Sequence, residues 1–217
     1  MKGLLTKDLI LLRQQSKSLL IIAMCGIMMS VAFEKTAVIG YLGIIGTMLA
    51  VGTLSYDEFD NGFSFLFTLP FARKTYVREK YLLCIAIAAI LILFGSAVSC
   101  IMMAAGSTGI DFNEIALSAG SMFFIALLFT SFLLPIRIKY GSEKGRTITY
   151  IFYAAILLLT FGGSKVLEMV GINIPAFVAK LDSMNPYVIL GILCLVILAL
   201  VIVSEKITER IIEKKEF

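Results

Sequence analysis

The sequence predicts an all-α polytopic membrane protein, and three observations support this fold class. The 217 residues are 59% hydrophobic and 16% charged, with a mean hydropathy of +0.97, a composition that soluble domains do not have. Several apolar runs reach the roughly 17–25 residues that a helix needs to cross the hydrocarbon core of a bilayer. The segments between these runs carry most of the basic residues. We therefore expect one transmembrane domain, residues 1–217, with six helical spans.

The predicted spans follow one another along the chain. We expect them at residues 18–33, 37–54, 81–105, 115–136, 147–163 and 186–203. The first two are so close in sequence that they must form an antiparallel hairpin. The second span carries small residues at three- and four-residue spacing, namely Gly43, Gly46, Thr47 and Ala50. Such a face lets helices approach closely, and helix packing within one subunit is favoured over a specific dimer motif.

Four segments outside the spans have recognisable patterns. Residues 1–17 place leucines mostly on one side, interrupted by Asp8, and basic residues on the other; this favours an interfacial helix on the inner leaflet over a plain basic flank. Residues 137–146 form a basic loop. Residues 164–185 have apolar positions at helical spacing, which predicts two interfacial helices on the outer face. Residues 204–217 are a charged tail, typical of a solvated helical extension.

The distribution of basic residues predicts the orientation. The two termini and the segments 55–80 and 137–147 hold 16 of the 19 Lys and Arg residues, whereas the opposite connections hold Lys35, Lys165 and Lys180. Basic loops stay on the cytoplasmic side of a membrane. We therefore expect a multi-pass protein of the cell membrane, with both termini and the central loop at 55–80 in the cytoplasm.

The central loop, residues 55–80, is the longest polar interruption between two apolar runs. Its first half can form a short helix from Tyr56 to Thr68, in which polar and aromatic residues separate onto opposite faces. The polar face consists of Asp57, Asn61, Ser64 and Thr68. The opposite face consists of Phe59, Phe63, Leu66 and Phe67. We expect this helix to lie flat, with its aromatic side against membrane lipid or protein.

Two residues weaken or end this helix. Gly62 weakens it, because a glycine in a helix interior costs about 1 kcal/mol relative to alanine. Pro70 ends it. The basic cluster that follows belongs on the cytoplasmic side of a bilayer. It consists of Arg73, Lys74, Arg78 and Lys80.

The composition excludes several function classes. The chain has no histidine, so HExxH zinc sites, Ser-His and Cys-His catalysis and histidine proton relays are excluded. The four cysteines lie singly in apolar runs without CxxC spacing, which predicts small buried residues and neither a metal site nor disulfides. The net charge of +4 without a long basic tract indicates no nucleic-acid partner. We expect no catalytic residue and no metal site on this chain.

The predicted spans contain no means of energy coupling. None carries Lys, Arg, Asp or Glu away from its ends, whereas ion-coupled transporters bury such groups at the coupling site. The GSEKGRT segment at 141–147 lacks the spacing of a Walker A loop, so the chain is not expected to hydrolyse ATP. Energy for transport must then enter from another polypeptide, through the helix at Tyr56 to Thr68.

Several short motifs resemble the membrane subunits of type-2 ABC exporters. They are Tyr56-Asp57-Glu58, Leu69-Pro70-x-x-Arg73, Val77 and Lys80-Tyr81, together with the opening Met1-Lys2-Gly3-Leu4-Leu5 and Lys7-Asp8-Leu9. Within that group the chain looks most similar to the compact permeases that export phenol-soluble modulins, which are amphipathic helical peptides. The resemblance implies an elbow helix at residues 1–17 and a coupling helix at Tyr56 to Thr68.

The same resemblance implies the partners and the sites. Two permeases, either two copies or one copy and a sister chain, are expected to work with cytoplasmic ATPase subunits that bind ATP and magnesium, so no cofactor is expected on this chain. The expected ATPase contacts are Tyr56, Asp57, Glu58, Asp60, Asn61, Ser64 and Arg73. An amphipathic peptide cargo suits flexible or aromatic walls. The candidate pathway residues are Met102, Met103, Phe123, Phe124, Phe129 and Phe132.

Less specific interpretations of the same residues, and one other function class, also fit these patterns. Aromatic and methionine side chains in membrane helices commonly face lipid or neighbouring helices, and acidic residues of an interfacial loop are commonly only solvated. An energy-independent membrane module, either an immunity protein or an assembly scaffold, has the same hydropathy as an exporter subunit. The two classes differ in their dependence on the ATPase, because only an exporter stops working when the Walker lysine of its partner is replaced.

Overall fold

The computed structural model describes residues 2–59, 62–66, 68, 72–105, 110–169 and 186–215. Within these ranges the regular structure is helical, with seven α-helices and no strand. The helices are α1 (Lys2–Gln14), α2 (Ser16–Ala32), α3 (Ala37–Glu58), α4 (Gly62–Leu66), α5 (Arg73–Ala105), α6 (Phe112–Met169) and α8 (Pro186–Lys214). The all-α fold class expected from the sequence is therefore confirmed for the described residues.

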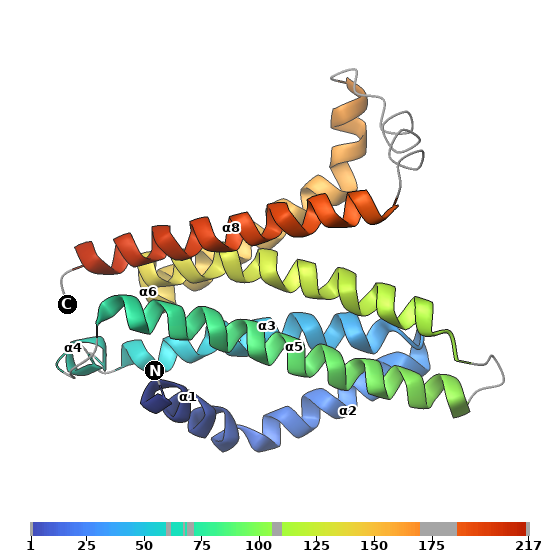
Figure 1. Ribbon diagram of the computed structural model, residues 1–217, viewed down its shortest axis with the longest axis horizontal. Helices are drawn as coiled ribbons and strands as arrows, with labels where there is room; N and C mark the ends of the chain where they lie inside the picture. The colour runs from blue at the N-terminus through green and yellow to red at the C-terminus, as the bar shows by residue number, and fades with distance from the viewer. Residues whose placement is uncertain are drawn as a thin grey trace.

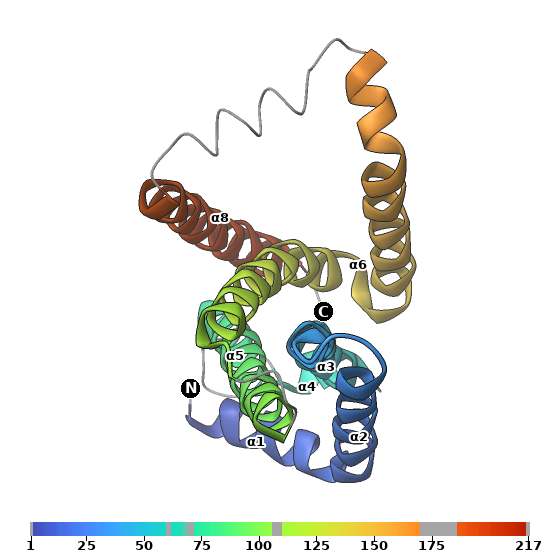
Figure 2. The ribbon, with the colours of Figure 1, turned by 90° about the vertical axis from the view of Figure 1, so that its right-hand side faces the viewer.

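The long helices lie side by side and run alternately in opposite directions (Figure 1). α3 and α5 occupy the middle of the molecule, with α1 and α2 on one side and α6 and α8 on the other (Figure 2). α3 contacts α2, α5 and α6 and so links the two sides. Both chain termini lie at the same end of the molecule as α4, and we call this end the α4 end (Figure 1). The connection between α2 and α3 lies at the opposite end.

Two hydrophobic clusters hold the helices together. The first lies at the α4 end and draws side chains from six helices, including Leu4, Leu54, Phe63, Tyr76, Leu134 and Ile212. The second lies toward the opposite end and joins α3, α5 and α6 through residues such as Ile39, Ile92, Met103 and Met122. Because the first cluster joins helices from the beginning, the middle and the end of the chain, it fixes the relative positions of these helices at the α4 end.

Three helices are long and apolar enough to cross a membrane, namely α3, α5 and residues 112–141 of α6. A fourth crossing is counted if α1 and α2, which are bent by 68° relative to each other, form one broken span. These counts concern the described residues alone. The second, third and fourth predicted spans thus coincide with helices of sufficient length. The first, fifth and sixth fall on α2, the later part of α6 and α8, and their status as spans stays a prediction.

Residues 137–146, expected as a loop, are helical except for one glycine. Gly141 has φ 79° and ψ 177°, a conformation that residues with a Cβ rarely adopt. It divides α6 into a first half, residues 112–140, and a second half, residues 142–169. A Cβ at this position would also lie 2.8 Å from Glu58 Oε1. The structure therefore replaces the expected loop by a kink, because one glycine is enough to redirect the chain.

Glycines let α3 pack closely against its neighbours. A Cβ at Gly43 would lie 2.6 Å from Met122 Cγ of α6, and a Cβ at Gly95 of α5 would lie 3.1 Å from Ile39 Cα of α3. Gly46 is likewise buried on α3. The small-residue face of the second predicted span therefore packs inside one chain. This confirms the interpretation that the sequence favoured over a dimer motif.

The charged tail at 204–217 continues α8 as a helix to Lys214. Its Ser204, Thr208 and Ile212 are buried, so one side of this extension packs against the bundle. The tail is the expected helical extension, but only part of its surface is exposed. Apolar and hydroxyl side chains recur at helical spacing along its other side and find partners on α5 and α6. The interfacial helices predicted at 164–185 cannot be compared beyond Met169, since residues 170–185 lie outside the described residues.

Candidate functional site

The central loop does not form one helix. α3 continues through Glu58, and Phe59 then has φ −61° and ψ 138°, an extended conformation that ends the helix. α4 begins at Gly62 and is five residues long. A Cβ at Gly62 would lie 2.6 Å from the Asp57 carbonyl oxygen, so the close approach of α4 to the end of α3 requires glycine at this position. The expected helix from Tyr56 to Thr68 is therefore corrected to two separate helices.

α4 directs some aromatic side chains inward and leaves others at the surface. Phe63 and Leu66 are buried, and the Phe63 ring packs edge-on against Tyr76 of α5 with ring centroids 5.9 Å apart. Phe65 is 72% exposed, and Phe59, just before α4, is 74% exposed. α4 is thus anchored to α5 through Phe63 and presents aromatic side chains on the outside of the molecule.

Four charged side chains from three helices meet at the α4 end; three of them are buried and Lys7 is half-buried. This buried ion cluster consists of Lys7 and Asp8 of α1, Asp57 of α3 and Lys80 of α5. Lys80 Nζ lies 2.8 Å from Asp57 Oδ2 and also pairs with Asp8. Lys7 pairs with Asp57, and its Nζ lies 3.2 Å from Asp8 Oδ1. Two cations and two carboxylates therefore compensate each other.

Neighbouring side chains extend the buried ion cluster. The Tyr76 hydroxyl donates to Asp57 Oδ2 at 2.8 Å, and Lys80 Nζ donates to the Thr53 hydroxyl at 3.2 Å. Lys80 Nζ also lies 5.4 Å from the centroid of the Tyr76 ring. Lys80 is 0% exposed and Asp57 is 4% exposed. Because an unpaired charge would be costly in this environment, the pairs hold α1, the end of α3 and the start of α5 in fixed relative positions.

The cluster gives Asp57 a different position from the one expected. The sequence pattern placed its carboxylate on the outer face of a flat helix, where another subunit would contact it. Because α3 stays helical to Glu58, Asp57 instead shares the buried face of α3 with Ala50 and Thr53. Its ion-pair partners Lys7 and Lys80 were not expected from the sequence. The one available signal for the cluster was Asp8, an acidic residue on the apolar side of residues 1–17.

The other expected contact residues lie in varied environments. Tyr56 is 51% exposed, and its hydroxyl accepts a hydrogen bond from Gln15 Nε2 at 2.6 Å. Glu58 is half-buried, and its Oε1 lies 3.8 Å from Lys215 Nζ. Three further positions lie outside what the structure describes: Asp60, Asn61 and the side chain of Ser64.

Arg73 bonds within the chain. Its Nη1 donates to the carbonyl oxygens of Ile212, Glu213 and Lys215, at 3.1, 3.2 and 3.0 Å. These carbonyls lie at the C-terminal end of α8, where a cation complements the helix dipole and the unpaired acceptors. Arg73 therefore fixes the end of α8 against the start of α5, a role that the sequence did not indicate.

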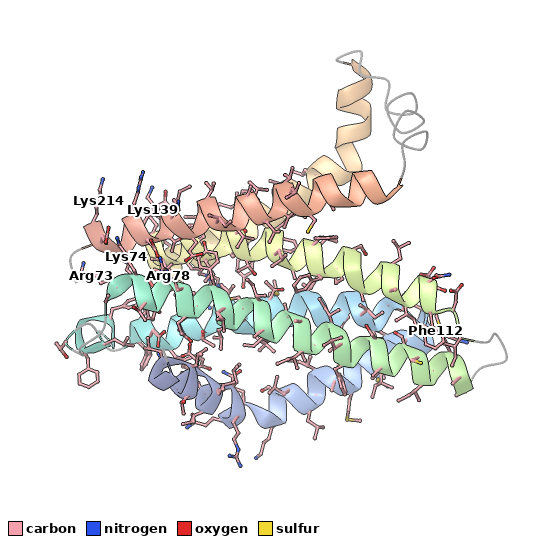
Figure 3. The ribbon with its side chains drawn as sticks, viewed as in Figure 1. Arg73, Lys74, Arg78, Phe112, Lys139 and Lys214 are labelled. Atoms are coloured by element: carbon pink, nitrogen blue, oxygen red, sulfur yellow. The ribbon has the colours of Figure 1, made fainter. Side chains whose placement is uncertain are left out.

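Ion pairs at the surface also join α5 to α8. Arg78 Nε lies 3.3 Å from Glu205 Oε1 and 3.1 Å from Glu209 Oε1, and Lys74 Nζ lies 3.2 Å from Glu213 Oε1. The labelled basic side chains of α5 gather at the α4 end beside α8 (Figure 3). Exposed pairs of this kind contribute about 0–1 kcal/mol each. These surface pairs therefore contribute little to the stability of the chain, in contrast to the buried ion cluster.

Three of the six candidate pathway residues, Met103, Phe123 and Phe129, lie in or beside the hydrophobic clusters. Met103 is buried in the second cluster and Phe123 packs against it, whereas Phe129 packs against the first cluster. Phe132 is exposed, and Met102 and Phe124 are half-buried. The cavities described at the α4 end are lined by other residues. A role for these six residues in a pathway stays a prediction.

Comparison with known proteins places this arrangement in a family. The family model described as "ABC-2 family transporter protein" matches residues 3–213. Of the described helices, this range includes all but the first residue of α1 and the last residue of α8. Searches of curated proteins and of solved structures gave no match. The matched range contains both the membrane-length helices and the charged α4 end. The chain therefore belongs to the ABC-2 transporter family, whose members are the membrane components of ABC transporters and are not themselves catalytic.

Proposed function

We propose that this chain is the permease subunit of an ATP-driven exporter that moves amphipathic peptides of the phenol-soluble modulin kind, or similar amphiphiles, out of the cell. Two permeases, either two copies of this chain or one copy and a sister chain, work with cytoplasmic ATPase subunits that bind ATP and magnesium. Membership of the ABC-2 family supports the permease role. The resemblance of the central loop to that of peptide exporters supports the cargo class.

One observation supports the coupling mechanism: exposed aromatic side chains lie next to the buried ion cluster, whose charged side chains are paired with one another. The docking surface consists of Tyr56, Phe59 and Phe65, all more than half exposed. Aromatic residues that are exposed in one chain and anchored from behind are typical of contact sites for another protein. The basic residues of this end favour a cytoplasmic location, which is where an ABC ATPase lies.

Force applied to the docking surface has a continuous route into the spans. Gly62 of α4 lies so close to the Asp57 carbonyl oxygen that a Cβ would not fit between them, and Phe63 of α4 packs against Tyr76. Asp57 and Tyr76 both belong to the network around Lys80. Closure of the ATPase pair would therefore move α1, the end of α3 and the start of α5 together, as a rigid-body rotation. α5 then carries the motion along its whole length into the membrane.

The chemistry of the spans supports an apolar or amphipathic cargo. The predicted spans carry no charged residue away from their ends, and the charges of the buried ion cluster lie at the α4 end. A pathway between such helices offers apolar contacts and few fixed charges, which suits a peptide with one apolar face. The candidate pathway residues, among them Met102 and Phe132, are the first positions to substitute once transport is measured.

Docking of the ATPase is tested by substitution on the docking surface. Phe59→Asp and Phe65→Asp are each expected to reduce the ATPase that co-purifies with the chain by about tenfold or more, because a buried aromatic anchor contributes about 2 kcal/mol or more to an interface. Phe112→Asp is the matched control, since Phe112 is equally exposed but lies at the opposite end of the molecule (Figure 3). The partner used in this test is an ABC ATPase from a reading frame adjacent to that of the chain, where we expect it to be encoded. Unchanged co-purification, or an equal loss with Phe112→Asp, would contradict this docking surface.

Direction and cargo are tested in inside-out membrane vesicles that contain the chain and its ATPase. We expect ATP to drive accumulation of a labelled phenol-soluble modulin inside the vesicles, because export from the cell corresponds to import into such vesicles. An ATPase without its Walker lysine is expected to abolish the accumulation. Accumulation that is independent of ATP would favour the energy-independent module. ATP-driven uptake that excludes every amphipathic peptide tested would overturn the cargo class.

A further inference from the structure

A second polar feature at the α4 end takes no part in the proposed coupling route. A cavity of about 160 Å³ lies between α3 and the two halves of α6. Its apolar walls are Met48, Val51 and Leu133, and its polar groups are Arg137, Arg146, Thr149 and Tyr150. Two guanidinium groups at one small cavity, on facing segments of a membrane protein, call for a physical explanation.

Two glycines bring the arginines together. Gly141 has a positive φ of 79°, and at this residue the second half of α6 turns away from the direction of the first half. Gly145 is buried, and a Cβ there would lie 3.1 Å from Arg137 Cδ and 3.3 Å from Arg137 Cα, so the absent side chain lets the two halves approach closely. Arg137 on the first half and Arg146 on the second then line the same cavity.

The cavity lies at the level where the predicted spans meet the cytoplasm. The fourth predicted span ends at residue 136 and the fifth begins at residue 147, so Arg137 and Arg146 are the first residues outside the two spans. Met48 belongs to the second span. The cavity thus has cationic groups at the expected inner boundary of the bilayer and apolar walls on the membrane side, a combination that matches a lipid headgroup and the start of its chains.

The surrounding charges leave the site positive. The segment 137–146 holds four basic residues and one acidic residue, Glu143. Glu58 and Arg137 line the same shallow surface gap. Arg137 Nη1 donates to the Ser55 hydroxyl at 3.4 Å. Arg146 is exposed. The four cations of this segment outnumber the two carboxylates, Glu58 and Glu143, so the site favours an anion.

We propose that this cavity binds the phosphate group of an anionic lipid of the inner leaflet. Guanidinium groups bind phosphate oxygens in a bidentate manner and are the side chains best suited to this task. The volume of about 160 Å³ lies below the roughly 300–1,000 Å³ of sites that enclose whole drug-sized ligands, so the cavity suits a small group such as a phosphate and excludes a folded peptide. Met48 and Tyr150 are exposed at its edge, which leaves room for an acyl chain alongside α3 and α6. The lipid would hold the two halves of α6 together at the kink, whatever the transported cargo.

The test uses the full chain in detergent, titrated with phosphatidylglycerol or phosphatidylcholine, with bound lipid counted by native mass spectrometry. We expect phosphatidylglycerol to remain bound and phosphatidylcholine to dissociate. Arg146→Gln is expected to weaken phosphatidylglycerol binding by about tenfold, because a hydrogen bond to a charged group contributes about 1.5–3 kcal/mol. Arg146→Lys keeps the charge and loses the bidentate geometry, so its affinity for phosphatidylglycerol is expected to lie between those of the unmodified chain and Arg146→Gln. Arg137→Gln gives a second, independent variant.

The matched control is Lys144→Gln, which removes an exposed positive charge from the same turn without altering the cavity lining. An equal loss of lipid in Lys144→Gln and Arg146→Gln would overturn the site in favour of general surface attraction. Equal retention of the two lipids, or an Arg146→Gln variant that binds phosphatidylglycerol as the unmodified chain does, would also overturn it. Displacement of the lipid by inorganic phosphate alone would assign the cavity to free phosphate. Persistence of the lipid in excess phosphate supports the lipid site.

Discussion

Lys80→Met is expected to lower the free energy of unfolding of the isolated chain by about 3–5 kcal/mol, the cost of removing one partner from a buried ion pair. Lys80 is fully buried and bonds Asp8, Asp57 and Thr53. Methionine keeps the length of the side chain but leaves two carboxylates with only Lys7 as a cation. The purified chain is heated in detergent, and size-exclusion chromatography then gives the temperature at which the folded peak is lost. A lower temperature for the variant reports the loss of stability.

Lys74→Met is the matched control for this prediction. Lys74 lies on the same helix and pairs with Glu213, but both side chains are about half exposed, so its loss is expected to cost no more than about 1 kcal/mol. A double variant, Lys80→Met with Asp57→Asn, removes one cation and one carboxylate together. It is expected to be more stable than the sum of the single changes indicates, because the two residues share one network. Equal effects of Lys80→Met and Lys74→Met would show that the buried ion cluster does not stabilise the chain.

Gly95→Leu is expected to be the second most damaging substitution, with a loss of about 1–3 kcal/mol from overpacking. The first atom of the new side chain would already lie 3.1 Å from Ile39 Cα and 3.4 Å from the Val38 carbonyl oxygen. Backbone atoms cannot move aside as a flexible side chain does, so α3 and α5 would have to separate. Such contacts between small residues and backbone are a principal source of helix association in membranes. The same unfolding measurement in detergent detects the loss.

Gly120→Leu is the control for this second prediction. Gly120 also lies in a long apolar helix, but a Cβ there has no neighbouring atom within 4 Å. The substitution is therefore expected to leave stability unchanged or to raise it by up to about 1 kcal/mol through helix propensity. If both variants unfold alike, the tight contact between α3 and α5 does not exist in the folded protein.

These variants separate the internal stabilisation of the chain from its docking to the ATPase. Asp57 and Lys80 stabilise the chain itself, so their substitution is expected to lower stability before any partner is present. Phe59 and Phe65 are exposed and contribute little to packing, so their substitution is expected to affect docking alone. Comparison of unfolding with ATPase co-purification therefore distinguishes an internal brace from an external contact.

Much of the architecture could be predicted because the rules for apolar runs are local. A run of about 20 apolar residues forms a helix in a bilayer, since every backbone hydrogen bond must be satisfied within the segment. For this reason the helical class and the long helices α3, α5 and the first half of α6 followed directly from the amino-acid order. The small-residue face around Gly43 and Gly46 was also recognisable, because close packing requires small side chains at helical spacing.

The loops were less predictable because their structure depends on contacts that are distant in sequence. The periodicity of Tyr56 to Thr68 is compatible with one helix, but α3 ends before Phe59. The separate helix that follows directs Phe63 and Leu66 into the first hydrophobic cluster. At 137–146, four basic residues suggested a loop, yet a single glycine at 141 was enough to make the turn. Local pattern identifies polar segments, but packing decides their path.

The amino-acid sequence by itself determined that the chain is an apolar helical membrane protein with its charges at the ends of the helices, because hydrophobicity and helical period are properties of single segments. Only the tertiary structure decided which of those charges meet. Lys7 and Asp57 are 50 positions apart, and Asp8 and Lys80 are 72 positions apart. Their pairing depends on how three helices are placed against one another, and no segment contains that information alone. The difference between a surface carboxylate and a buried brace at Asp57 therefore arises from packing.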